Sequence, residues 1–192
     1  LKAAIDDSKK NDWILISDST WENYDVGLDV MEGYLISISQ ALDKIDQDPT
    51  HIFLQAGVGG LAASFAAYCR KKLGYFPIII IVEPSYAPCL QKSIEMEKPT
   101  SVDGPASNMG RLDCKYPSRQ AFYSLSKTAN AFVSITEDES LKGTKFLSKR
   151  GLNISQSSSA GFVALQKLNQ RGEFLLDKKA RVLCVFSEGI MI

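Results

Sequence analysis

The amino-acid sequence predicts an α/β fold, in which a mostly parallel sheet carries helices on both faces and forms three layers. Strand-like and helix-like hydrophobic patterns alternate along the 192 residues. Residues 78–82 are a run of isoleucine and valine, which is typical of a buried central strand in a parallel sheet. The apolar residues 52–54 lead into a glycine-rich turn and a helix pattern, as in units whose parallel strands are joined by helices.

The predicted elements follow one another in a regular order. Short apolar runs predict strands at residues 13–16, 52–54, 78–82, 131–135 and 182–186. The first of these follows a polar stretch, and we expect it to be a buried strand. Apolar residues at helical spacing predict helices at residues 30–45, 61–73, 87–96, 120–129 and 159–169, and a further helix starts at Glu137. Two prolines and two glycines predict a loop over residues 97–113.

Composition argues against several classes of protein. The chain has 22 basic and 22 acidic residues, so no surplus of positive charge favours nucleic acid or an anionic membrane as a partner. Its longest apolar run, residues 76–82, is too short to span a bilayer. Four scattered cysteines without a CxxC motif predict reduced thiols in core positions, a cytoplasmic setting and no metal site. The chain begins with Leu1 rather than methionine, and we expect it to be a piece of a longer protein.

The glycine-rich turn is the candidate binding site. Backbone N–H groups left free at the start of a helix favour a phosphate, together with the helix dipole. Gly57, Gly59 and Ala62 match the G-x-G-x-x-G/A pattern of dinucleotide sites, and Glu83 ends the next strand where a ribose-binding acid is expected. The same turn suits the single phosphate of pyridoxal phosphate (PLP). A tight strand–helix connection without a ligand is a third interpretation.

Five sequence blocks bear on this choice. They are DSTWENY at residues 18–24, MEGY at 31–34, PTHIFLQAGVG at 49–59, IVEP at 81–84 and SEG at 187–189. In this order and at this spacing, the blocks resemble the diaminopropionate ammonia-lyases. These are PLP enzymes of fold type II, the group of the tryptophan synthase β-subunit. The resemblance extends from residue 13 to residue 189, and the first and third blocks are its most specific part.

The resemblance implies a role for six residues. Four of them match the loop whose amides hold the cofactor phosphate: Gly57, Val58, Gly59 and Gly60. Asp18 matches an aspartate beside the substrate α-carbon that acts as an acid or base. Ser187 matches the hydroxyl residue that meets the pyridine nitrogen, and a neutral partner there favours elimination over transamination.

The resemblance also implies a reaction and a domain organisation. The reaction is α,β-elimination of ammonia from 2,3-diaminopropionate or a similar small amino acid, which yields pyruvate and a second ammonia. Residues 1–20 would end a small domain, and residues 21–192 would form the large cofactor-binding domain of a homodimer. The lysine that binds the cofactor lies ahead of Leu1 in the family, so we expect the isolated chain to be inactive.

Some positions differ from the family pattern. Ser157 and Ser159 stand where the family has glutamate and glycine, and charged side chains replace small ones in one loop, at Arg111, Asp113 and Lys115. Two alternatives therefore stay open: a catalytically inactive PLP-enzyme relative and an NAD-binding dehydrogenase domain.

Three further positions have ordinary structural interpretations. His51, the only histidine, is expected to be a solvated turn residue, and Glu83 to cap a neighbouring loop. The serines at residues 157–159 are expected to cap the helix that follows them.

Overall fold

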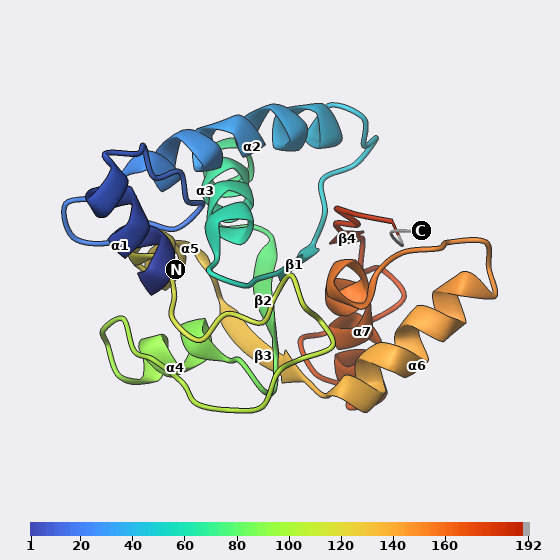
Figure 1. Cartoon of the computed structure of the whole chain (residues 1–192). Helices are drawn as coiled ribbons and strands as arrows, with labels where there is room; N and C mark the ends of the chain where they lie inside the picture. The colour runs from blue at the N-terminus through green and yellow to red at the C-terminus, as the bar shows by residue number, and fades with distance from the viewer. Residues whose placement is uncertain (190–192) are drawn as a thin grey trace.

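The computed structural model describes residues 1–189, so residues 190–192 of the predicted large domain lie outside the description. Within the described residues the chain forms seven helices and four strands (Figure 1). The helices are α1 (Lys2–Asn11), α2 (Val26–Leu42), α3 (Gly60–Leu73), α4 (Cys89–Glu95), α5 (Arg119–Thr128), α6 (Glu137–Ser148) and α7 (Gln156–Gln170). The strands are β1 (His51–Gln55), β2 (Ile78–Pro84), β3 (Ala131–Ile135) and β4 (Val182–Cys184).

The four strands form one parallel sheet in the order β3-β2-β1-β4. His51 pairs with Ile78 on one side and with Val182 on the other. Strand β1 is buried throughout, and β2 is buried after its first residue. Because helices cover both faces of these strands, their hydrophobic pattern is continuous rather than alternating. The predicted α/β fold class is confirmed.

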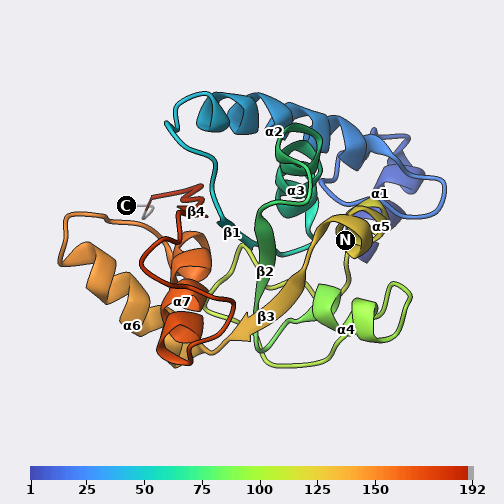
Figure 2. The ribbon, with the colours of Figure 1, turned by 180° about the vertical axis from the view of Figure 1, so that it is seen from behind.

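Helices lie on both faces of the sheet (Figures 1 and 2). Successive strand residues point to opposite faces, which divides the core in two. On one face, Ile52 and Ile79 pack with residues of α3 and α5. On the other face, Phe53 and Ile80 pack with residues of α7. The sheet is therefore the central layer of three. Helix α2 packs on α3 in one outer layer, and α6 packs on α7 in the other.

Residues 13–16 depart most from the predicted elements. They form neither helix nor strand, and Trp13, Ile14 and Ile16 are 66%, 89% and 76% exposed. The prediction of a buried strand at residues 13–16 is therefore wrong. An apolar run is buried only where another segment covers it, and none of the described residues covers these side chains. The segment is held by Tyr24 instead. The Tyr24 hydroxyl donates to the carbonyl oxygen of Leu15 at 2.8 Å.

The prediction for His51 is also wrong, because this residue is buried at 4% exposure rather than solvated. Its Nε2 lies 2.7 Å from the carbonyl oxygen of Phe174, and its Nδ1 lies 2.8 Å from the hydroxyl of Thr50. The other elements lie close to their predicted positions, although α2 begins at Val26 instead of residue 30. Among residues 1–189, no helix is both long and apolar enough to cross a membrane.

Candidate functional site

The glycine loop joins the carboxyl end of β1 to the start of α3. The backbone of Gly59 has a φ of 99°, a left-handed conformation that side chains disfavour. A Cβ on Gly57 would lie 2.8 Å from the carbonyl oxygen of Arg111, so only glycine fits there without a shift. Both glycines are thus required by the path of the chain. The loop brings bare backbone to the first turn of α3, whose N–H groups have no acceptor within the helix.

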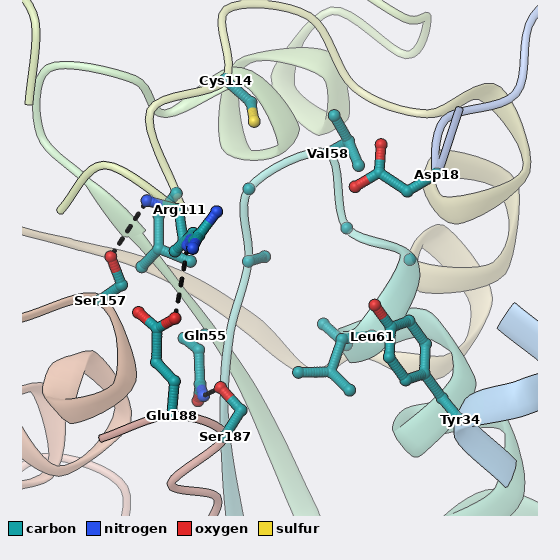
Figure 3. Close-up of a pocket in the computed structure, with 16 residues that line it drawn as sticks. Asp18, Tyr34, Gln55, Val58, Leu61, Arg111, Cys114, Ser157, Ser187 and Glu188 are labelled. Carbon is teal, nitrogen blue, oxygen red and sulfur yellow. Dashed lines mark hydrogen bonds and ion pairs between the residues drawn. The ribbon is translucent and has the colours of Figure 1, made fainter. Parts of the chain in front are cut away.

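The loop borders a pocket of about 320 Å³ (Figure 3). All six predicted site residues line this pocket: Asp18, Gly57, Val58, Gly59, Gly60 and Ser187. They come from the segment before α2, from the β1–α3 loop and from the chain after β4. Parallel strands place such loops at one edge of the sheet, which is where ligands bind in open α/β folds.

Asp18 is held near the glycine loop through its neighbour Thr20. The backbone N–H of Thr20 donates to the Ser118 hydroxyl at 3.0 Å. The N–H of Arg119 donates in turn to the carbonyl oxygen of Thr20 at 2.9 Å. Ser118 also donates its own N–H to the carbonyl oxygen of Val58 at 2.9 Å. The buried Ser118 therefore fixes the segment of Asp18 and the glycine loop relative to each other.

Ser187 is held by Gln55, the last residue of β1. The Gln55 amide donates from Nε2 to the carbonyl oxygen of Val185 at 2.9 Å and to the Ser187 hydroxyl at 3.2 Å. The Gln55 carbonyl oxygen Oε1 is buried and has no hydrogen-bond partner within residues 1–189. Sequence reasoning missed Gln55, although its place at the end of a strand beside the glycine turn was a usable signal.

A hydrogen-bonded network closes another side of the pocket. The side-chain Nε of Arg111 lies 3.3 Å from Glu188 Oε2, and the backbone N–H of Arg111 donates to the Ser157 hydroxyl at 3.1 Å (Figure 3). The Ser155 hydroxyl donates to Glu188 Oε1 at 2.6 Å.

The residue that caps α7 is Ser155, whose hydroxyl accepts from the N–H of Ser158 at 3.0 Å, so the prediction of a cap within 157–159 is wrong by two residues.

The positions that differ from the family pattern divide into two groups. Arg111 and Ser157 line the pocket. Lys115 and Asp113 pair with each other at 2.7 Å instead, and this hydrogen bond lowers the pKa of the Asp113 carboxyl. The Ser159 hydroxyl forms a hydrogen bond of 3.0 Å with the Thr144 hydroxyl, which connects α7 to α6.

Glu83 is committed to a structural role. Its two carboxylate oxygens accept from the N–H groups of Leu90 and Gln91 at 2.8 and 2.7 Å, so it caps the start of α4. Burial raises the pKa of Glu83 to about 7. The predicted capping role is confirmed. Because Glu83 is fully buried and does not line the pocket, it cannot make the ribose contact that the dehydrogenase alternative requires.

The cysteines are free thiols in or near the core. Cys89 is buried, and its Sγ lies 3.7 Å from the carbonyl oxygen of Gly57. Cys114 lines the pocket, where burial raises the pKa of its thiol. Burial raises the pKa of the Cys89 thiol as well, so burial disfavours the thiolate at both positions.

The arrangement fits a pyridine cofactor that carries one phosphate. The glycine loop can bind the phosphate with backbone amides, as helix starts commonly do. Ser187 offers a hydroxyl elsewhere in the same pocket. Asp18 adds a carboxyl group that can take up or release a proton.

Comparisons with known proteins agree with this geometry. The model of the family "Pyridoxal-phosphate dependent enzyme" matches residues 1–188. A diaminopropionate ammonia-lyase of Salmonella typhimurium is 29% identical over 199 residues, which cover 92% of this chain and 49% of that protein. The enzyme of the same name from Escherichia coli K12 is 27% identical and is covered to 52%. The chain thus spans about half the length of the curated relatives it matches.

Solved structures give the same result. Diaminopropionate ammonia-lyase from Escherichia coli, in complex with an aminoacrylate-PLP azomethine reaction intermediate, superposes with a TM-score of 0.85 at 25% identity, over 98% of this chain and 52% of that one. The processed form of threonine deaminase isoform 2 from Solanum lycopersicum shares the fold, with a TM-score of 0.83 at 18% identity over 97% of this chain and 52% of that one. The chain belongs to the family of pyridoxal-phosphate dependent enzymes, and its cofactor is pyridoxal phosphate.

Proposed function

We propose that this chain forms the cofactor-binding half of a PLP-dependent ammonia-lyase that acts by α,β-elimination on a small amino acid, most simply 2,3-diaminopropionate. One observation carries the proposal: the glycine loop, Asp18 and Ser187 border a single pocket, although they lie far apart in the sequence. The similarity to lyases supports the reaction type. Because the cofactor of the matched family is pyridoxal phosphate, the NAD-binding alternative is set aside.

Each residue has a distinct proposed task. The amides of residues 57–60 hold the phosphate, and Ser187 meets the ring nitrogen. When bound, the cofactor withdraws electrons from the α-carbon of an amino acid. Asp18 takes up or releases a proton beside that carbon, because its carboxyl group faces the pocket. Tyr34, which also lines the pocket, narrows the side on which Asp18 lies.

The rest of the active site comes from polypeptide outside this chain. We propose that residues 1–20 belong to a small domain and residues 21–192 to the large one. The exposure of Trp13 and Ile14, and the absence of buried residues in α1, support a covering segment here. That segment supplies the cofactor-binding lysine, so the isolated chain does not turn over substrate. A homodimer and a cytoplasmic location belong to the same proposal.

One observation favours a second candidate function, a catalytically inactive relative. The Arg111–Glu188 ion pair occupies the wall of the pocket at a position where the family has a small residue. An ion pair that stays in place would restrict the space for a substrate.

Pyruvate release tests the proposed function. The N-terminal half of the Salmonella typhimurium relative is added to the chain together with PLP and 2,3-diaminopropionate. We expect no pyruvate from the chain alone, pyruvate from the combination, and a loss of about 100-fold or more with Asp18→Asn. PLP binding without pyruvate release would favour the inactive relative, and failure to bind PLP would contradict both functions.

A further inference from the structure

Gln55 is a buried polar residue of the pocket that the proposed function leaves without a task. It ends β1 and is 3% exposed. Its side chain reaches the segment after β4, where it contacts Val185 and Ser187. Its Oε1 has no partner within residues 1–189, although buried amide oxygens are usually hydrogen-bonded.

The contact with Val185 fixes which way the Gln55 amide faces. The carbonyl oxygen of Val185 can only accept a hydrogen bond, and it lies 2.9 Å from the amide nitrogen. A flipped amide would place Oε1 against that carbonyl, oxygen to oxygen. The NH₂ group must therefore face Val185, and its second hydrogen is directed to the Ser187 hydroxyl oxygen at 3.2 Å.

This geometry determines how the Ser187 hydroxyl can act. A hydroxyl group has a single hydrogen and two acceptor positions. Because Ser187 accepts from Gln55, which offers it no acceptor, the Ser187 hydrogen remains available to the pocket. We propose that Gln55 is a positioning residue that makes Ser187 a hydrogen-bond donor toward the ring nitrogen of the cofactor, an inference that rests on the proposed function.

The direction of that hydrogen bond has a chemical consequence. A ring nitrogen that accepts a hydrogen bond is stabilised without a proton, because hydrogen bonding favours the form that it suits. If Ser187 were instead forced to accept, the protonated ring would be favoured. Gln55 thereby sets the charge state of the ring without touching it.

The test uses 4′-deoxypyridoxine 5′-phosphate labelled with ¹⁵N in the ring, a probe that needs no lysine. The ¹⁵N chemical shift reports ring protonation as a function of pH in the 192-residue chain. We expect the bound ring to protonate at least about one pH unit below the free probe. Gln55→Met should lose much of this difference, since methionine donates no hydrogen bond to Ser187.

Gln55→Glu should reverse the effect, because the carboxyl oxygen that replaces Nε2 keeps a proton for the carbonyl oxygen of Val185, accepts from the Ser187 hydroxyl and leaves Ser187 to accept from the ring. The double variant Gln55→Glu with Ser187→Ala separates this effect from the added charge. Gln91→Met is the matched control: within residues 1–189, Gln91 Oε1 is also buried without a partner, but Gln91 lies outside the pocket. This variant should titrate like the wild-type chain.

The outcomes distinguish the two proposals. A wild-type chain that does not bind the probe contradicts the proposed function, and the inference falls with it. A bound ring that protonates alike in wild type and Gln55→Met, or a Gln55→Glu effect that persists without Ser187, overturns the inference alone. The comparison of wild type with Gln55→Met decides the question even where Gln55→Glu does not fold.

Discussion

Residues 52–54 and residues 13–16 are both short apolar runs, yet one lies at the centre of the sheet and the other is exposed. The first run has strands on both sides, helices on both faces and a glycine loop at its end. The second makes backbone hydrogen bonds to the carbonyl oxygen of Ser8 and to the hydroxyl of Tyr24. The two runs show that an apolar run is buried only where strands and helices of this chain cover it.

The largest expected effect compares truncations in the two regions. Ile80→Ala removes a fully buried side chain from β2 and should lower the free energy of unfolding by about 2–5 kcal/mol. Ile14→Ala removes a side chain that is 89% exposed and should change it by less than about 0.5 kcal/mol. Urea denaturation measures both. A large loss at Ile14 would show that something covers this residue in solution.

A second substitution breaks the framework at the glycine loop. Gly59→Ala places a side chain at a φ of 99° and brings its Cβ to 2.9 Å from Leu90 Cδ1. We expect a loss of about 2–4 kcal/mol and weaker binding of PLP. The control is Gly110→Ala, whose Cβ would have no heavy atom of the described residues within 4 Å. Equal stability of the two variants would contradict the tight packing of the loop.

The buried carboxyl group of Glu83, at the end of β2, should make the stability of the chain depend on pH. Burial raises the pKa of Glu83 from 4.5 to about 7 in the folded chain. The stability that Glu83 contributes is therefore fully present below its unfolded-state pKa of 4.5, and it is lost as the pH rises through its folded-state pKa of about 7. The stability of wild type relative to Glu83→Gln should fall by up to about 3 kcal/mol between pH 4.5 and about 7. A flat difference between the two unfolding curves would contradict the raised pKa.

The smallest expected effect concerns the connection between the regions. Ser118→Ala removes the acceptor for the N–H of Thr20 and should cost about 1–2 kcal/mol. Ser126→Ala, which removes an exposed hydroxyl from α5, the helix that follows Ser118, should cost less than about 0.5 kcal/mol. Thermal unfolding of the two variants measures the difference, and similar midpoints would show that Ser118 is dispensable.

Much of the framework was predictable because its signals are local. The isoleucine run of β2 and the glycines after β1 report on burial and backbone path without reference to the rest of the chain. Residues 13–16 carry an equally local apolar signal. Their burial depends on another segment, and a single sequence pattern does not reveal whether that segment is present.

The site was predictable where a resemblance or a strand end marked it. Asp18 and Ser187 were found through the family blocks, and both line the pocket. Gln55 could have been found from topology, since β1 and β4 are neighbours and their carboxyl ends meet. Glu188 lies in the SEG block at residues 187–189, but the block does not reveal its ion pair with Arg111. Ser118 had no such signal, because its partners are set by packing between distant loops.

The position of Ser118 has a consequence for motion in the molecule. It bonds to Val58 in the glycine loop and to Thr20, a residue 98 positions away in sequence. Both loops bond to the same residue, so opening of one removes a contact that holds Ser118 in place for the other, and the two openings are thermodynamically linked. A phosphate ester that holds the amides of residues 57–60 should consequently slow deuterium uptake at the amide of Thr20, which the ligand does not need to touch.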